Sequence, residues 1–346
     1  MNHLKTALKY LVPLIIAVLL VKFILTSIDP EVMMKKIAQA DGRWVALTVF
    51  ISLIAHLSRA YRWNLLMKPL GFRPALSSTF IAVMVAYFGN IFLPRMGEVL
   101  RCVTLTRIEK VPFNSSFGTV VAERAFDFIC LLSLVGLSLV LEFERFSLFF
   151  NEVVFNKSAK TPAESNLKFY LILGGVVLVS FVLFLIFRNR IFSSALFIKI
   201  KTFLKGILEG VFSIRKLENK GAFLFHTFVI WACYFLMTYL AFFALPSTAN
   251  LGPLAGLVIL IVGGLGMSAP ASGGIGPFHI MVAGALTLFY GLSKDDGVAY
   301  AFVIHTSQFA SLFIIGGICA IISIVLAKKR KGDDRTIVSE PLLQSK

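Results

Sequence analysis

Residues 90–101 read NIFLPRMGEVLR, and this stretch decides the fold because it interrupts a helix between two apolar segments. Proline removes a backbone donor and clashes with the preceding turn, and glycine weakens a helix by about 1 kcal/mol relative to alanine. Pro94 and Gly97 together therefore end one helix and begin another. The segment from residue 75 to about residue 105 is predicted to be a helical hairpin with its tip at Leu93-Pro94.

A second helix break lies within residues 263–277, which contain six glycines and two prolines. Its tip reads PASG at residues 270–273, and the first tip reads PRMG at residues 94–97, so both carry Pro-x-x-Gly. Unpaired backbone groups at membrane depth are tolerated only inside protein or beside a wet cavity. We expect the two tips to form one site at mid-membrane, although the glycines can also serve close helix packing alone. The candidate residues of the second tip are Pro270, Gly273, Gly274 and Gly276.

The composition is typical of a membrane protein. The 346 residues are 58% hydrophobic and only 15% charged, whereas an average soluble domain has about 25% charged residues. Apolar runs long enough for a hydrocarbon core start near residues 8, 44, 76, 116, 169, 222, 253, 275 and 298. They leave no room for a soluble domain. The first run, residues 8–28, has no small-residue cleavage site and is expected to stay as an anchor.

The sequence carries no metal or nucleotide motif. Its four cysteines lie singly in or beside apolar stretches, without ligand spacing, and are expected to be packing residues. A GxxxxGK[ST] loop for nucleotide phosphates is absent. We therefore expect no cofactor and no metal site.

The basic residues predict the topology. The net charge of +16 suggests nucleic acid in a soluble protein, but in a membrane protein the position of the charges matters more. Five segments assigned to the cytoplasm contain 24 Lys and Arg residues, whereas the outer loops contain 8 and carry 9 acidic residues. The cytoplasmic segments are residues 1–9, 59–74, 95–115, 188–220 and 328–346. This excess predicts a multi-pass protein of the cell (inner) membrane with both termini in the cytoplasm.

The assignment requires two hairpins of opposite orientation. Residues 75–105 must enter and leave from the cytoplasm and residues 253–291 from outside, each as a re-entrant or fully spanning hairpin. Six other helices span once, at residues 8–28, 44–58, 116–140, 169–187, 222–244 and 298–327. The predicted fold is an all-α integral membrane bundle, with residues 1–327 as one membrane domain and an inverted repeat of units 44–140 and 222–327. Such repeats, with broken helices meeting near the midplane, are typical of transporters.

Charged residues beside the first break give that hairpin its chemistry. Arg95, Glu98 and Arg101 follow Asn90 and Pro94, and a helix would place Glu98 and Arg101 at i, i+3, where they can pair. Arginine holds phosphate or carboxylate with two parallel hydrogen bonds, and free amides at a helix start add partial positive charge. An anionic head group fits this arrangement. Alternatively, the arginines are topology anchors at the interface.

Charged residues also lie inside two of the predicted spans or at their ends. Glu123, Arg124 and Asp127 lie about a third of the way along residues 116–140, and Glu123 and Asp127 share one helix face. A carboxylate there can pair with Arg95 or Arg101, as a fixed ion pair or as part of a proton path. Arg59 and Arg62 also share a face, and we interpret them as interface anchors or as head-group contacts.

Polar groups elsewhere in the apolar helices have a simpler reading. His279, His305 and Gln308 are expected to form interhelical hydrogen bonds rather than to bind a ligand. Residues 188–220 alternate basic and apolar side chains and predict an amphipathic helix on the cytoplasmic leaflet. Residues 328–346 are predicted to be a polar tail without fixed structure.

The motif order resembles a known family. GNIFLPRMGEVLR at residues 89–101, ERAFD at 123–127, PASGGIG at 270–276 and RAYRW at 59–63 are similar to the lysylphosphatidylglycerol synthase transmembrane family over roughly residues 8–327. The resemblance implies a flippase-like protein similar to the membrane half of the bacterial multiple peptide resistance factor, without the aminoacyl-transferring synthase domain. It implies a lipid cargo without identifying the lipid.

These observations predict a flippase or scramblase-like transporter of an anionic lipid head group. The expected partners are membrane lipids of the anionic phospholipid or polyprenyl-phosphate type and no nucleic acid. The sequence is also compatible with a homo-oligomer and with a separate lipid-modifying enzyme as a partner. The alternatives are a lipid-modifying transferase with Glu98, Glu123 or Asp127 as base, and a scaffold for envelope lipid synthesis. An enzyme is the less favoured reading.

Overall fold

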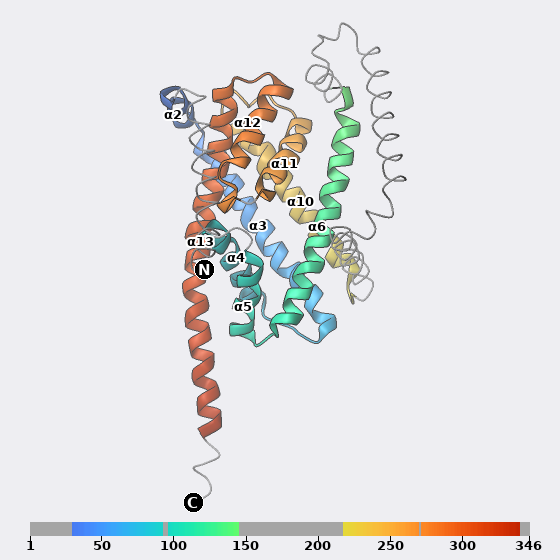
Figure 1. The fold of residues 1–346 in the computed structure, drawn as a ribbon, viewed down its shortest axis with the longest axis vertical. Coiled ribbons are helices and arrows are strands. Elements are labelled where there is room, and N and C mark those ends of the chain that lie inside the picture. Colours follow the sequence, from blue (N-terminus) through green and yellow to red (C-terminus); the bar gives the residue numbers. More distant parts are fainter. Residues whose placement is uncertain (1–29, 93–95, 145–216, 270, 340–346) are drawn as a thin grey trace, which may run out of the picture.

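The computed structural model describes residues 30–92, 96–144, 217–269 and 271–339, and every regular element in these ranges is a helix (Figure 1). Five of these helices are long and apolar enough to cross a membrane, namely those over 42–70, 113–141, 220–244, 272–290 and 294–330. The all-α membrane prediction is therefore confirmed. The predicted spans at residues 8–28 and 169–187, and residues 188–216 of the amphipathic segment, lie outside the described residues.

The first half of the described chain contains the first predicted hairpin. It comprises α2 (Pro30–Ala38), α3 (Gly42–Met67), α4 (Leu76–Phe92), α5 (Gly97–Glu109) and α6 (Phe113–Leu141). Helices α4 and α5 pack against each other as the two arms of the predicted hairpin. Helix α2 lies in a predicted outer loop and is tied to α13 by Lys36, whose Nζ lies 2.6 Å from the Asp296 carboxylate.

The second half contains the second predicted hairpin. It comprises α10 (Lys220–Ala241), α11 (Pro253–Ser268), the short η4 (Ser272–Gly274), α12 (Pro277–Tyr290) and α13 (Lys294–Ser339). Helices α11 and α12 pack as its two arms. Figure 1 shows α4 and α5 in the lower half of the view and α11 and α12 in the upper half, with α13 running past both. The inverted repeat itself stays a prediction.

Two predicted boundaries are wrong. The second span was expected to end at Ser58, but α3 continues to Met67 and carries Arg59 and Arg62 inside the bundle. A long helix can hold these charges because carboxylates on α6 neutralise them. The polar tail was expected to lack structure, yet α13 continues as a helix to Ser339. An established helix extends easily into lysine- and arginine-rich sequence, since these residues are good helix formers.

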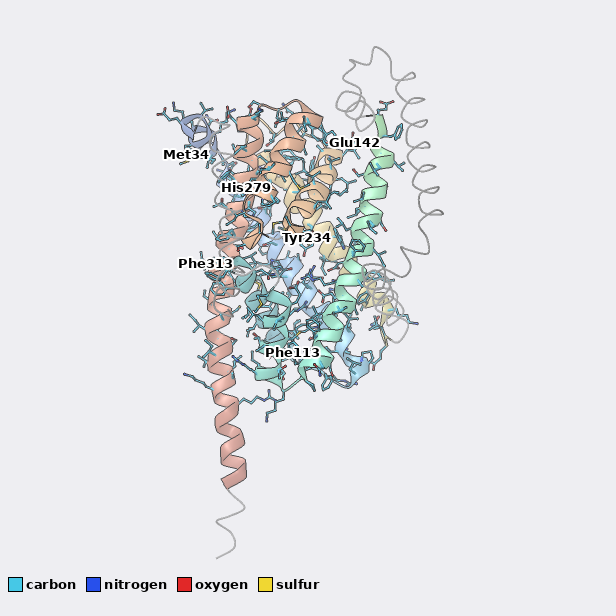
Figure 2. All side chains as sticks on the ribbon, viewed as in Figure 1. Met34, Phe113, Glu142, Tyr234, His279 and Phe313 are labelled. Atoms are coloured by element: carbon cyan, nitrogen blue, oxygen red, sulfur yellow. The ribbon has the colours of Figure 1, made fainter. Side chains whose placement is uncertain are left out.

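The core joins the two halves. Helices α3 and α10 form the most extensive helix pair, and both cross the middle of the bundle (Figure 1). One apolar cluster around Phe242, Leu286 and Tyr300 joins α10, α12 and α13, and another around Trp63 joins α3, α4, α5 and α6. In Figure 2, Tyr234 of α10 lies near mid-height, between His279 above it and Phe113 below it. The first hairpin is thus enclosed by α3, α6 and α13.

Candidate functional site

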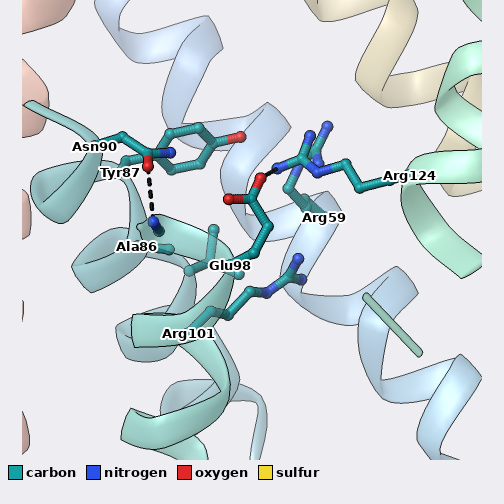
Figure 3. Close-up of a pocket in the computed structure, with 9 residues that line it drawn as sticks. Arg59, Ala86, Tyr87, Asn90, Glu98, Arg101 and Arg124 are labelled. Carbon is teal, nitrogen blue, oxygen red and sulfur yellow. Dashed lines mark hydrogen bonds and ion pairs between the residues drawn. The ribbon is translucent and has the colours of Figure 1, made fainter. Parts of the chain in front are cut away.

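A small polar pocket lies beside the first hairpin, between α3, α4, α5 and α6 (Figure 3). It encloses about 250 Å³ of empty space, including its open mouth. The lining consists mainly of side chains that the sequence marks as candidates, together with small apolar residues: Arg59, Val83, Ala86, Tyr87, Asn90, Gly97, Glu98, Arg101 and Arg124. Six of the predicted site residues therefore meet here.

The tip of the first hairpin is closed by a hydrogen bond. The backbone N–H of Gly97 donates to Oδ1 of Asn90 at 2.7 Å (Figure 3). A Cβ atom at Gly97 would lie 2.5 Å from the carbonyl oxygen of Ala86 and 2.6 Å from the Asn90 amide nitrogen. Only glycine allows the start of α5 to approach α4 this closely. Asn90 and Gly97 thus set the shape of the pocket wall.

Glu123 is the centre of the buried charge cluster. Its side chain has no exposed surface, and it accepts hydrogen bonds from Arg59 Nη1 at 2.9 Å and from Arg101 Nη1 and Nη2 at 3.2 and 3.1 Å. The predicted pairing of Arg101 with a carboxylate of residues 116–140 is confirmed. Since Arg101 is only 2% exposed, its interpretation as an interface anchor is wrong.

Asp127 lies one helical turn further along α6 and pairs with the arginines of α3. Arg62 Nη2 donates to Asp127 Oδ1 at 2.7 Å, and Arg59 Nη2 lies 3.2 Å from Asp127 Oδ2. Arg59 and Arg62 are 3% and 0% exposed. Their interpretation as anchors in the interfacial belt is therefore wrong. Both guanidinium groups belong to the buried cluster because the Glu123 and Asp127 carboxylates lie beside them there.

Glu98 and Arg124 form an ion pair at the edge of the pocket. Arg124 Nη2 lies 3.4 Å from Glu98 Oε1, and the two side chains are 44% and 29% exposed (Figure 3). The pairing of Glu98 with Arg101, expected from their i, i+3 spacing, is wrong. Arg101 instead turns toward α6 and stacks on the ring of Trp63, 3.9 Å from the ring centroid. The charged part of the site therefore has a buried layer and a partly exposed layer.

The charges of the described cluster do not cancel. Four guanidinium groups, of Arg59, Arg62, Arg101 and Arg124, face three carboxylates, of Glu98, Glu123 and Asp127. One positive charge is left over. In a site of low dielectric such a charge attracts an anion far more strongly than it does in water. The pocket is thus suited to one singly charged anion, which arginine can hold with two parallel hydrogen bonds.

Several residues of the site were missed by sequence reasoning. Tyr234 accepts a hydrogen bond from Arg59 Nη2 at 3.1 Å, and Thr227 accepts one from Arg62 Nη1 at 3.1 Å. Tyr87 lines the pocket and contacts the ring of His56, with ring centroids 4.5 Å apart and the rings tilted by 47°. Thr227 and Tyr234 are seven residues apart and so share one face of α10, which is a signal that could have identified them.

The described residues of the second hairpin meet the first hairpin but do not line the pocket. The two tips are adjacent, since Ser272 Oγ donates to the carbonyl oxygen of Phe92 at 3.5 Å. Gly273, Gly274 and Gly276 have positive φ angles of 59°, 75° and 95° and form the turn of the second tip. Gly273 accepts a hydrogen bond from His305, so the expected interhelical bond of that histidine is confirmed. Pro94, Arg95 and Pro270 lie outside the described residues.

Comparisons with known proteins place the chain in a group of membrane proteins. A family model for the lysylphosphatidylglycerol synthase TM region matches residues 10–316. Glycosyltransferase AglD of Haloferax volcanii is 27% identical over 128 residues, which are 37% of this chain and 20% of AglD. A UPF0104 membrane protein of Methanocaldococcus jannaschii is 28% identical over 117 residues, 33% of this chain and 35% of that protein.

A UPF0104 membrane protein of Pyrococcus horikoshii is 24% identical over 327 residues, which are 90% of this chain and 96% of that protein. The matches to the first two relatives span only a fifth and about a third of their length. No solved structure matches the chain. The helical bundle, the apolar spans and the family match agree with the resemblance seen in the motifs. The chain is a multi-pass membrane protein that belongs to the lysylphosphatidylglycerol synthase transmembrane-region family.

Proposed function

We propose that this protein is a lipid flippase or scramblase that passes an anionic head group through the pocket of the first hairpin. The observation that carries the proposal is the positive charge left over among the described arginines and carboxylates around the pocket, which lies inside an apolar helix bundle. Charged groups at such depth are costly and normally serve an ion or substrate path. A phosphate ester of a membrane lipid supplies the missing negative charge.

The surroundings of the pocket suit a lipid better than a soluble anion. Large apolar side chains are exposed on the same helices that enclose it, among them Phe92 of α4 and Phe117, Val121 and Phe128 of α6. In a bilayer these surfaces contact acyl chains. The head group can therefore enter the polar pocket while its acyl chains remain in the hydrocarbon. This separation of head group and tail is what moving a lipid across a bilayer requires.

The size of the pocket restricts what it holds. The space that a water-sized sphere can enter is only about 10 Å³, which is room for about one water molecule. A phosphate-sized group therefore needs the hairpin to move away from α6 before it can enter. Tyr87 and Asn90 line the pocket beside the arginines and offer neutral hydrogen-bonding groups. We propose an anionic phospholipid or a polyprenyl-phosphate lipid as cargo.

Glu98 is positioned to compete with the cargo. Its carboxylate lies at Arg124, where a phosphate oxygen would otherwise bind. Cargo that binds Arg124 releases Glu98, and departure of the cargo restores the ion pair. The partly exposed pair Glu98–Arg124 then acts as a gate over the buried Arg59, Arg101 and Glu123. We expect Glu98→Gln to retain cargo longer and to slow its release.

The test uses purified protein in liposomes that contain fluorescent phospholipids or polyprenyl-phosphate lipids. We expect the protein to accelerate transbilayer movement of at least one anionic lipid, and Arg124→Gln to reduce that rate at least about tenfold. Arg107→Gln is the matched control, because it removes the same charge from an exposed position of α5 outside the pocket. Movement no faster than in protein-free liposomes, across the whole panel, would refute the proposal.

A second candidate is a lipid-modifying transferase. It is favoured by one relative that carries the name glycosyltransferase AglD and by Glu98, whose buried Oε2 has no hydrogen-bond partner in the described part of the chain and is free to act as a base. Radiolabelled lipid and sugar donor test it directly. Product formation that is abolished by Glu98→Gln would favour the enzyme over the transporter.

We also propose an orientation in the membrane and an inverted-repeat arrangement of the two halves. The lower half of the bundle in Figure 1, with the first hairpin, faces the cytoplasm, and units 44–140 and 222–327 are inverted repeats in the cell (inner) membrane. The excess of basic residues in the assigned cytoplasmic segments supports this direction. Arg107→Cys, in a protein whose four native cysteines are replaced by alanine, should react with a membrane-impermeant thiol reagent only after the cells are opened. Labelling in intact cells would reverse the orientation.

A further inference from the structure

The second hairpin and α13 each contribute one histidine to a buried pair that the proposed pocket does not use. His279 of α12 and His305 of α13 are 3% and 9% exposed, and their ring centroids lie 4.7 Å apart. Figure 2 shows His279 in the upper half of the bundle, away from the charged cluster at α3 and α6. Both rings contact the tip of the second hairpin by hydrogen bonds. The protonation state of the two rings therefore decides whether these hydrogen bonds to the tip can form.

The hydrogen bonds fix which ring nitrogen of each histidine carries a hydrogen. His305 Nε2 lies 2.8 Å from the carbonyl oxygen of Gly273, which can only accept, so Nε2 is the protonated nitrogen. His279 Nδ1 accepts from the backbone N–H of Gly276 at 3.4 Å. In the neutral ring its hydrogen is therefore on Nε2. That Nε2 is buried and has no hydrogen-bond partner among the described residues.

A proton on His279 is incompatible with this arrangement. The imidazolium carries hydrogens on both nitrogens, so Nδ1–H would face the N–H of Gly276, donor against donor. The bond at the start of α12 is then lost, at a glycine with φ of 95° that already forms part of a tight turn. The same tip touches the first hairpin through Ser272 and Phe92. Protonation thus loosens the contact between the two tips.

The surroundings of the pair in the closed tip are apolar. Three phenylalanine rings pack around the histidines: Phe302 lies 4.4 Å from His279, and Phe278 and Phe309 lie 5.1 and 6.2 Å from His305. Gln308, one turn after His305, has a buried amide nitrogen without a partner in the described ranges, and this group can only donate a hydrogen bond. Burial without a hydrogen-bond acceptor disfavours a charged ring, so a proton binds more readily once the tip has opened to water. The proton therefore favours the open tip over the closed one.

Few other titratable groups face the pair within the described residues. Helix α11 has none, α12 has only Tyr290 besides His279, and α13 has no charged side chain between Asp296 and Lys328. Tyr87 of α4 and Tyr234 and Tyr239 of α10 belong to neighbouring elements. The pair thus has no carboxylate or ammonium group beside it on α11, on α12 or on α13 between Asp296 and Lys328.

We propose that the His279–His305 pair is a proton-binding site that couples lipid movement to protons by releasing the second hairpin tip from the first. One proton taken up from water binds Nδ1 of His279, the Gly276 hydrogen bond breaks, and the tip contact at Ser272 opens. Loss of the proton restores the bond. The coupling to lipid movement rests on the proposed function, whereas the opening of the tips does not.

Spin labels test the opening without any lipid assay. The four native cysteines are replaced by alanine, and nitroxide labels are attached at Met96→Cys and Met267→Cys in the full chain. Both positions are exposed and lie beside the two tips, so the Ser272 hydroxyl stays in place. We expect dipolar broadening of the spectrum at about pH 8 and its loss at about pH 5, where an imidazole is protonated. In His279→Gln, whose amide oxygen can still accept from Gly276 but cannot take up a proton, the broadening should persist at both pH values.

His226→Gln is the matched control, because His226 bonds Ser58 on a different helix pair and its loss should leave the pH response unchanged. Broadening that is insensitive to pH in the parent protein overturns the proposal without the need for any variant. An equal pH response in His279→Gln overturns it as well. In liposomes, an inward proton gradient should speed lipid movement about tenfold in the parent protein and less than twofold in His279→Gln. If no lipid moves at any pH while the labels still respond, the proposed function fails and the proton site stands.

Discussion

Replacing Glu123 by glutamine keeps the size of the side chain and removes the charge on which the cluster is centred. Four arginine nitrogens lie close to the Glu123 carboxylate: Arg59 Nη1 at 2.9 Å, Arg101 Nη2 and Nη1 at 3.1 and 3.2 Å, and Arg62 Nη2 at 3.5 Å. Breaking one buried ion pair while leaving its partner costs about 3–5 kcal/mol. Since Glu123 serves at least two arginines directly, we expect Glu123→Gln to lie at the upper end of that range.

The measurement is the melting temperature of the detergent-solubilised protein. At about 2 °C per kcal/mol for a chain of this size, Glu123→Gln should melt about 10 °C below the parent protein. Glu109→Gln is the control, because Glu109 pairs with the exposed Arg330 at 3.4 Å and such a surface pair contributes at most about 1 kcal/mol. Adding Arg101→Gln should recover part of the loss, since one unpaired charge is removed. Equal melting temperatures for Glu123→Gln and Glu109→Gln would refute the cluster as a source of stability.

Three further predictions use the same assay. Gly97→Ala should destabilise the protein by about 1–3 kcal/mol, because the new methyl group would lie 2.5 Å from a carbonyl oxygen. Gly118→Ala, whose methyl group would have nothing within 4 Å, should be neutral or stabilising, and equal effects of the two substitutions would contradict the tight hairpin tip. Gly316→Ala should destabilise the protein more than Gly317→Ala. A methyl group at Gly316 would lie 2.8 and 2.9 Å from atoms of α4, whereas one at Gly317 would lie 3.5 Å from a ring of α4. The reverse order would argue against the α13–α4 contact. Arg101→Lys should cost about 1.5–3 kcal/mol, because lysine loses the two-nitrogen bond to its carboxylate and the stack on the indole ring; a melting temperature like that of the parent would show that neither matters.

The positions of the hairpins could be predicted from sequence because proline and glycine act locally. The break at Gly97 and the glycine-rich stretch before Pro277 appear in the structure where they were expected. Helix positions followed in the same way from apolar runs of sufficient length. These signals depend on residues within a turn or two of each other and need no knowledge of the partner helix.

The partners of the charged residues could be predicted only in part because they lie on other helices. The sequence correctly paired Arg101 with a carboxylate of α6, which in the structure is Glu123. The i, i+3 spacing also paired Arg101 with Glu98, and this prediction was wrong because Glu98 pairs with Arg124. Arg59 and Arg62 looked like the end of a span because charge usually marks an interface. Their burial depends on two carboxylates more than sixty residues away, which no local pattern reveals.

The leftover positive charge of the cluster has an electrical consequence. Moving one elementary charge through a membrane potential of 100 mV involves about 2.3 kcal/mol. Without cargo, the described cluster carries that charge, so any motion of it along the membrane normal is driven or opposed by the potential. With a singly charged lipid phosphate bound, the same cluster is neutral and moves without electrical work. A transporter built this way would respond to voltage on its empty return step and not on its loaded one.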